Sequence, residues 1–271
     1  MRDSMNMATL RAGAARDMAG KDIVLIHGAN CGAWCFEKFQ PVFADAGWTC
    51  HVPDLPGHGA DATEPEAVKG LGMTDYRKAL DRLLSRFTTP PVLLGHSIGA
   101  VLAQQLAAEG RARALVLLSP APRAGILPAT DREKKLCTDL MSIGPFWTRA
   151  LPPDFQLACY YSLNWIPEGE RRAIFECFVP ESGRALFELF FWMFDSERAT
   201  EVDVSAVRCP VYCLSGTDDN LVSIDTARAV AGSYPGAMFV AAEGHGHLLL
   251  LEPGAEEIAS GIADWLRGLA A

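Results

Sequence analysis

The chain has 271 residues, of which 49% are hydrophobic and 21% are charged, and its formal net charge is −9. This composition is typical of a globular protein with a substantial core. The negative charge argues against nucleic acid or an anionic membrane as a partner, because both are bound through clustered Lys and Arg. No apolar run approaches the length of a membrane span, so we expect none.

Residues 1–20 mix Arg and Asp and contain no apolar segment of the secretory kind, so we expect a mobile tail there. The eight cysteines include two pairs with four-residue spacing, Cys31 with Cys35 and Cys209 with Cys213. Neither pair has the C-x-x-C spacing of zinc or redox sites. We therefore expect free thiols and a cytoplasmic location.

Apolar runs alternate with longer amphipathic patterns, which predicts an α/β protein with a mainly parallel sheet and helices on both faces. The second predicted helix is capped by Thr74 or Asp75. The predicted strands are 22–26, 48–53, the run before Ser97, 114–118, 210–214 and 237–242, and the predicted helices are 33–46, 74–86, the segment after Ser97, 223–233 and 255–269.

Residues 121–205 differ from the rest of the chain. They show no strand pattern, prolines divide them into short helical pieces, and they hold more than half of the aromatic residues. Eighty-five residues are too many for an ordinary loop. We predict an inserted helical cap at 121–205 on a core formed by 21–120 and 206–271. Its aromatic side chains join cap to core or line an apolar pocket.

The segment around Ser97 reads Val-Leu-Leu-Gly-His-Ser-Ile-Gly-Ala, a Gly-x-Ser-x-Gly motif between a predicted strand and a predicted helix. This is the pattern of a nucleophile elbow, in which a sharp turn exposes a serine hydroxyl. A serine nucleophile also needs a base and an acid that orients the base. Each of the acidic and basic candidates follows the carboxyl end of a predicted strand, where open parallel sheets collect their sites.

Asp218 and Asp219 are the two candidate acids, and His245 and His247 are the two candidate bases. Either choice gives the order Ser, Asp, His along the chain. The sequence contains no nucleotide-binding glycine loop and no cluster typical of a metal site, so we expect neither cofactor nor metal. His27 and His58 are expected to brace loops around the site.

From residue 22 to residue 269 the chain resembles the α/β-hydrolase superfamily. The segments His27-Gly28-Ala29-Asn30-Cys31-Gly32-Ala33-Trp34 and Ala46-Gly47-Trp48 resemble the plant methylesterase and hydroxynitrile lyase branch, whereas Asp54-Leu55-Pro56-Gly57-His58-Gly59 is similar to bacterial carboxylesterases. The resemblance implies Asp219 as the acid and His247 as the base. It also implies an oxyanion hole formed by the N–H groups of Ala29 and Ile98.

The lyases of this branch carry a lysine directly after the catalytic histidine, and this chain has Leu248 there, which argues against lyase activity. A serine at the elbow likewise argues against the chemistries that use an elbow carboxylate. Substrate contacts are expected from the loop, the cap and the position after His247, namely Asn30, Phe146, Trp147, Tyr160, Trp165, Phe191, Trp192 and Leu248.

The leading hypothesis is therefore a serine hydrolase that cleaves a carboxylic ester of a small or medium apolar molecule through an acyl-enzyme. A second hypothesis applies the same three residues to a thioester, a lactone or a carbon–carbon bond. A third is a ligand receptor that retains the hydrolase shell without turnover. The sequence does not separate the substrates, because the cap decides them.

Overall fold

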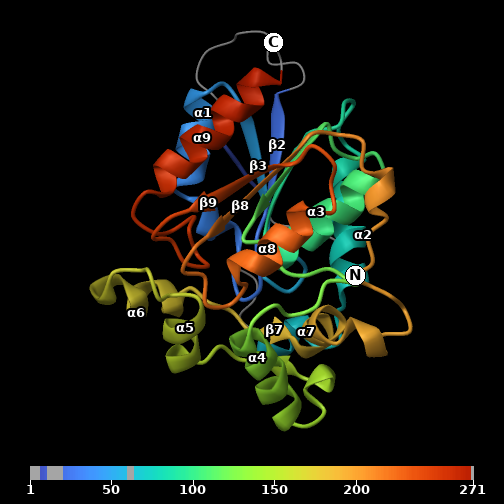
Figure 1. Ribbon diagram of the computed structural model, residues 1–271, viewed down its shortest axis with the longest axis vertical. Helices are drawn as coiled ribbons and strands as arrows, with labels where there is room; N and C mark the ends of the chain where they lie inside the picture. The colour runs from blue at the N-terminus through green and yellow to red at the C-terminus, as the bar shows by residue number, and fades with distance from the viewer. Residues whose placement is uncertain (1–6, 11–20, 60–63, 270–271) are drawn as a thin grey trace.

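The computed structural model describes residues 7–10, 21–59 and 64–269. These residues form one large sheet of seven strands in the order β1-β3-β2-β4-β5-β8-β9, in which β1 pairs antiparallel with β3 and all other neighbours are parallel (Figure 1). The strands are β1 (Met7–Leu10), β2 (Asp22–Ile26), β3 (Thr49–Pro53), β4 (Val92–His96), β5 (Ala114–Leu118), β8 (Val211–Gly216) and β9 (Met238–Ala242).

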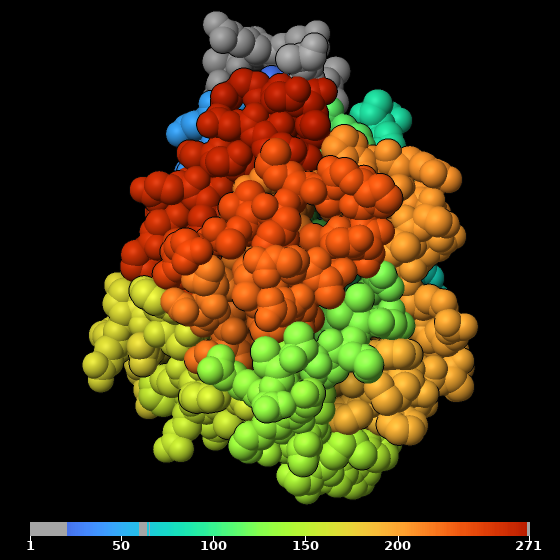
Figure 2. All heavy atoms as spheres, in the orientation of Figure 1, coloured from blue at the N-terminus to red at the C-terminus, as the bar shows by residue number. Residues whose placement is uncertain are grey.

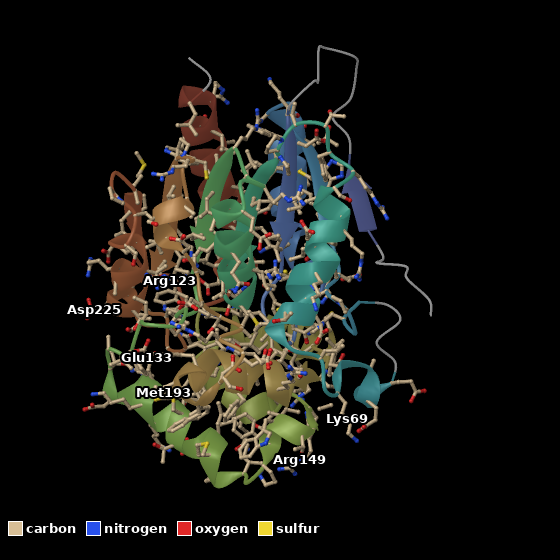
Figure 3. The ribbon with its side chains drawn as sticks, turned by 90° about the vertical axis from the view of Figure 1, so that its right-hand side faces the viewer. Lys69, Arg123, Glu133, Arg149, Met193 and Asp225 are labelled. Atoms are coloured by element: carbon tan, nitrogen blue, oxygen red, sulfur yellow. The ribbon has the colours of Figure 1, made fainter. Side chains whose placement is uncertain are left out.

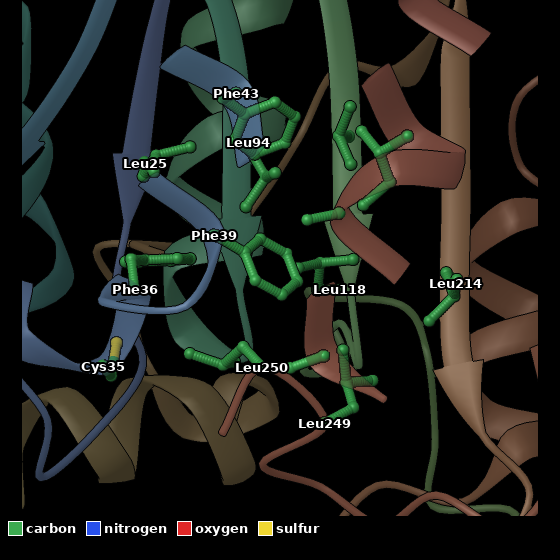
Figure 4. Close-up of a cluster of buried hydrophobic side chains, with 14 of the residues drawn as sticks. Leu25, Cys35, Phe36, Phe39, Phe43, Leu94, Leu118, Leu214, Leu249 and Leu250 are labelled. Atoms are coloured by element: carbon green, nitrogen blue, oxygen red, sulfur yellow. The ribbon is translucent and has the colours of Figure 1, made fainter. Parts of the chain in front are cut away.

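Alternate residues of the central strands point to opposite faces, and each face buries its own hydrophobic cluster. Ile23 and Leu25 of β2 pack in the cluster that includes α1 (Phe39–Asp45) and α9 (Ala255–Gly268), part of which is drawn in Figure 4. Val24 and Ile26 pack in the second cluster. That cluster includes the helices of the other face, α2 (Met73–Leu84), α3 (Ile98–Ala108) and α8 (Ile224–Ala231).

Three local predictions are corrected by the structure. The segment 33–46 is a 3-10 turn, η1 (Ala33–Phe36), followed by α1, because Pro41 lacks an N–H and is tolerated only in the first turn of a helix. Helix α2 has Gly72 as its N-cap, and the Asp75 carboxylate accepts the N–H of Gly72 at 2.8 Å from inside the first turn.

The third correction concerns the predicted tail, where Met7–Leu10 forms the edge strand β1. Four residues held mainly by backbone pairing leave little trace in a hydrophobic pattern. The rest of the tail, 1–6 and 11–20, lies outside the described residues.

The segment between β5 and β8 is largely helical, and it covers the lower end of the molecule in Figure 2. One prediction for it was wrong, because residues 150–151 and 181–182 pair as a two-stranded antiparallel sheet. The elements here are α4 (Asp131–Ser142), η3 (Phe146–Thr148), β6 (Ala150–Leu151), α5 (Phe155–Tyr161), α6 (Glu168–Glu176), β7 (Glu181–Ser182), α7 (Gly183–Phe190), η4 (Trp192–Phe194) and η5 (Val204–Ala206); η2 (Pro65–Val68) lies earlier, before α2.

Helix α4 is tied to the N-terminus of α8 through one carboxylate. Glu133 accepts the Ser223 N–H at 2.9 Å and the Ser223 hydroxyl at 3.0 Å, and it also closes the capping box of its own helix with Thr130. Figure 3 labels Glu133 at this boundary, with Asp225 of α8 on the other side. A buried carboxylate accepting hydrogen bonds from both elements fixes one corner of this segment to the sheet domain.

Candidate active site

The elbow at Ser97 is enforced by its backbone. Ser97 joins β4 to α3 with φ 52° and ψ −119°, a conformation that few non-glycine residues adopt. The two motif glycines allow close approach on either side. A Cβ on Gly95 would lie 2.3 Å from the carbonyl oxygen of Gly99, and a Cβ on Gly99 would lie 2.4 Å from that of Ile26. Only glycine at both positions lets α3 start this close to β4 and β2.

Asp219 and His247 are joined by a hydrogen bond. His247 Nδ1 lies 2.8 Å from Asp219 Oδ2, and both side chains are buried. The other carboxylate oxygen accepts the N–H groups of Leu221 and Val222, each at 2.8 Å. The carboxylate is therefore fixed on both sides, and its bond to Nδ1 leaves Nε2 as the free nitrogen of the His247 ring.

The competing acid and base occupy other environments. Asp218 is exposed, and its backbone hydrogen-bonds to the His245 carbonyl and the Asn164 amide. His245 Nδ1 lies 3.0 Å from Glu252, whose carboxylate also accepts the N–H of Gly246. Burial raises the pKa of Glu252, against the lowering effect of these hydrogen bonds. The structure therefore pairs Asp219 with His247 and gives His245 a partner of its own.

His96 links the elbow to the loop that carries His247, a role that the sequence analysis missed. Its Nε2 donates to the carbonyl of His247 at 2.9 Å, and the two imidazole rings lie 4.9 Å apart. Burial, with a further effect of His247, holds the pKa of His96 well below its usual value. Among the described residues the Ser97 hydroxyl has no hydrogen bond to His247, and such bonds often tighten only when substrate binds.

The loop after β2 lies directly against the elbow. A Cβ on Gly28 would be 3.0 Å from Ser97 Cβ. His27 braces this loop, as expected: its Nδ1 donates to the Gly28 carbonyl at 2.8 Å while its Nε2 accepts the Leu55 N–H at 2.9 Å. Burial and nearby His58 lower the pKa of His27 to about 3, so the ring is neutral.

The two expected oxyanion donors lie on either side of this contact, at Ala29 in the loop and at Ile98, the first residue of α3. Within the part of the chain that the structure describes, neither N–H has a protein acceptor. Unpaired backbone donors beside a buried nucleophile are suited to a developing negative charge.

The residues expected to contact substrate fall into separate groups. Phe146, Trp147 and Phe191 pack with Phe187 as an aromatic cluster inside the cap. Leu248 is buried in the core cluster next to α9. The remaining four are Asn30, whose amide donates to the Val179 carbonyl; Tyr160, which is half exposed; Trp165, whose ring lies against Gly244 and Gly246; and Trp192, which is partly buried.

Trp165 lies against the loop that carries His247, since Gly244 and Gly246 belong to that loop. Sequence reasoning also missed Glu181, a fully buried carboxylate of the segment between β5 and β8 that hydrogen-bonds the loop after β2. Nothing in its sequence neighbourhood distinguishes it from an exposed glutamate.

Within residues 7–10, 21–59 and 64–269, no group of three or more His, Cys, Asp or Glu side chains is placed to bind a metal ion. None of the helices in this part of the chain is both long and apolar enough to cross a membrane. All eight cysteines are free thiols, four of them buried.

Comparison with known proteins places this geometry in a family. Residues 23–260 match the model of the alpha/beta hydrolase family. The chain belongs to that family. Its arrangement of strands is therefore that of the α/β-hydrolase fold.

Relatives and solved structures agree with this membership. Methylesterase 9 of Arabidopsis thaliana is 36% identical over 83 residues, which is 30% of this chain and 32% of the relative. The magnesium-chelatase 30 kDa subunit of Rhodobacter capsulatus is 25% identical over 92% of this chain and 88% of its own. The monoacylglycerol lipase of Paleococcus ferrophilus superposes with a TM-score of 0.71 at 22% identity, covering 97% of this chain and 98% of the other. This chain thus spans about a third of Methylesterase 9 and most of the other two.

Proposed function

We propose that this α/β-hydrolase is a serine hydrolase that cleaves a carboxylic ester of a small or medium apolar molecule through an acyl-enzyme. The observation that carries the proposal is the buried His247–Asp219 hydrogen bond at the strand ends next to the strained Ser97 elbow. A histidine oriented by a carboxylate beside a serine is the arrangement that makes a hydroxyl nucleophilic at neutral pH.

In the proposed reaction Ser97 Oγ attacks the ester carbonyl while His247 Nε2 takes the hydroxyl proton. Asp219 holds the imidazole in the required tautomer through Nδ1 and stabilises its cationic form. The tetrahedral oxyanion is bound by the N–H groups of Ala29 and Ile98. His247 then gives its proton to the leaving alcohol, and water, activated by the same histidine, releases the acid from Ser97.

The aromatic side chains of the cap at 121–205 support a substrate with an apolar portion. The similarity to Methylesterase 9 supports an ester. Trp165 is the cap residue with the best support for a substrate contact, because its ring lies against the loop that carries His247. Leu248 brings no positive charge to the leaving group, so the lyase chemistry of related enzymes has no cation here.

The test is labelling of the purified protein with a fluorophosphonate, followed by mapping of the modified residue and a series of p-nitrophenyl esters of increasing acyl length. We expect the label on Ser97. We expect Ser97→Ala to reduce kcat by about 10⁴- to 10⁶-fold. Labelling of another residue, or ester turnover that survives Ser97→Ala, would contradict the mechanism. Preference for a thioester or a β-diketone over every ester would keep the three residues and change the substrate.

A further inference from the structure

The Glu181 carboxylate has no part in the proposed reaction, although it is fully buried between the cap and the sheet domain. Its Oε2 accepts the Asn30 N–H at 3.3 Å and faces His58 Nε2 at 3.0 Å. Its Oε1 accepts the Tyr76 hydroxyl at 2.8 Å and the Ser182 N–H at 2.7 Å. Three of these donors belong to the sheet domain, so one side chain of the cap contacts three separate segments of the sheet domain.

The surroundings of His58 suit an imidazolium. Its Nδ1 faces the Pro56 carbonyl at 3.2 Å and its Nε2 faces the Glu181 carboxylate at 3.0 Å, so each ring nitrogen has an acceptor. On the other side of His58 lies neutral His27, with the ring centroids 5.1 Å apart. A buried carboxylate beside a buried cation is held in place more firmly than a neutral pair, because its hydrogen bonds are charge-assisted.

Asn30, the residue after the proposed oxyanion donor, is held by the same cap segment at three points. Besides the Glu181 contact, its side-chain amide donates to the Val179 carbonyl at 2.8 Å, and its own carbonyl accepts the Val179 N–H at 3.0 Å. Asn30 has φ 60°, a conformation that needs support from its surroundings. The cap therefore fixes the loop backbone directly after Ala29.

The two peptide planes that flank Ala29 are thus held from two sides. The plane between Gly28 and Ala29 is held by His27, which donates to the Gly28 carbonyl. The plane between Ala29 and Asn30 is held by Glu181, which accepts the Asn30 N–H. The Ala29 N–H lies in the first of these planes, and the second plane is joined to the first only through φ and ψ of Ala29. Holding the second plane therefore limits the rotations about Ala29 that would turn its N–H away from the site.

We propose that Glu181 is a positioning residue through which the cap orients the Ala29 N–H of the oxyanion hole. The proposal rests on the proposed function. It makes the oxyanion hole a joint product of the two domains: the sheet domain supplies both donors, and the cap supplies the carboxylate that aims one of them. A cap that moves away from the sheet domain withdraws Glu181 and loosens the hole.

Glu188 provides the matched control. It is also a buried cap carboxylate that joins the cap to the sheet domain, since it accepts the Met73 N–H at 2.7 Å. Its other partner is Arg184 of its own helix at 2.8 Å, and it has no contact with the loop of Ala29. A purely structural cap anchor would show the same behaviour at both positions.

The experiment compares Glu181→Gln and Glu188→Gln in the full chain with p-nitrophenyl butyrate as substrate and propyl trifluoromethyl ketone as inhibitor. This ketone forms a hemiketal with the serine and so reports oxyanion binding. All groups around Glu181 are donors, two at each oxygen, so an amide at this position removes the acceptor of the two donors that face its nitrogen. Loss of a whole oxyanion donor lowers kcat by about 100- to 1000-fold, so we expect about 10- to 100-fold for a misaimed one, with KM changed less than about 3-fold.

The ketone should lose affinity in Glu181→Gln by the same factor as kcat, whereas Glu188→Gln should leave both values near those of the wild type. If Glu181→Gln does not fold, Tyr76→Phe removes one hydroxyl from the same carboxylate, and we expect about a 3- to 10-fold loss with the same parallel between kcat and ketone affinity. Equal effects of the two glutamine variants, or a lower kcat without weaker ketone binding, would overturn the positioning role. Wild-type protein without ester turnover or label on Ser97 would overturn the proposed function instead.

Discussion

Elements of the sheet domain meet through close backbone contacts, whereas the polar contacts between the proposed cap and the sheet domain include several buried carboxylates. At the elbow, Gly95 and Gly99 leave no room for a Cβ. The same holds for Gly216 of β8, where a Cβ would lie 2.1 Å from the carbonyl oxygen of His245. At the boundary of the proposed cap, two buried carboxylates, Glu133 and Glu181, accept hydrogen bonds from the sheet domain beside apolar contacts and the backbone bond between Val179 and Asn30. These carboxylate contacts can be tested one at a time by single substitutions, whereas the backbone contacts at the elbow depend on glycine.

The largest expected effect concerns the frame alone. Asp219→Asn should reduce kcat by about 10⁴-fold, because an amide cannot hold His247 in the tautomer that accepts the Ser97 proton. Asp218→Asn is the control, since this neighbour is exposed and contacts His245 and Asn164 through its backbone. Steady-state ester hydrolysis measures both. An equal loss in the two variants would break the assignment of Asp219.

The second prediction tests the close backbone contacts. Gly99→Ala should lower the free energy of unfolding by about 3 kcal/mol, because the new Cβ would lie within 2.5 Å of the carbonyl oxygens of both Ile26 and His27. Gly261→Ala at an exposed position of α9, where a Cβ meets nothing within 4 Å, should raise it by about 0.5–1 kcal/mol. Urea unfolding measures both values. Unchanged stability of Gly99→Ala would show that the elbow can accommodate a Cβ at this position.

The third prediction concerns how the free energy of unfolding depends on pH. It distinguishes the sheet domain from the junction with the proposed cap. Burial lowers the pKa of His27 from 6.5 to about 3 and holds that of His96 well below 6.5. The unfolded chain therefore binds more protons than the folded one below pH 6.5, and each histidine lowers stability by up to about 1.4 kcal/mol per pH unit toward acid. Urea unfolding between pH 7 and pH 5 should show this slope, and His96→Gln should make it shallower.

The cap junction responds differently over the same range. Burial lowers the pKa of His58, but the Glu181 carboxylate outweighs this effect and raises the pKa above 6.5. The stability contributed through His58 is therefore fully present below pH 6.5 and is lost as the pH rises through the raised pKa. Burial raises the pKa of Glu181, but His58 outweighs this effect and lowers the pKa below 4.5. The stability contributed through Glu181 is therefore lost only as the pH falls through the lowered pKa. Between pH 4.5 and 6.5 the pair stays charged. If the unfolding free energy falls no more steeply with decreasing pH in the wild type than in His96→Gln, the acid sensitivity does not arise from this buried histidine of the sheet domain.

The parts of the site that follow strand ends were predictable from the sequence, because a parallel sheet brings its carboxyl ends together whatever the loops contain. This is why Ser97 and the two pairs of candidates could be named, although the choices of Asp219 over Asp218 and of His247 over His245 rested on resemblance. The helix break at Pro41 was also readable and was missed. Glu181 was not readable, since its partners lie 105, 123 and 151 residues away and only the folded cap brings them together.

The place where the cap enters the chain has a consequence for chain entropy. Strands β5 and β8 are direct neighbours in the sheet, with Leu118 opposite Leu214, and the whole cap is the loop that connects them. The entropy lost on closing a loop grows only with the logarithm of its length, so doubling this connection would cost only about 0.6 kcal/mol. A change in the length of this connection therefore adds or removes little entropy cost for closing the sheet around Ser97.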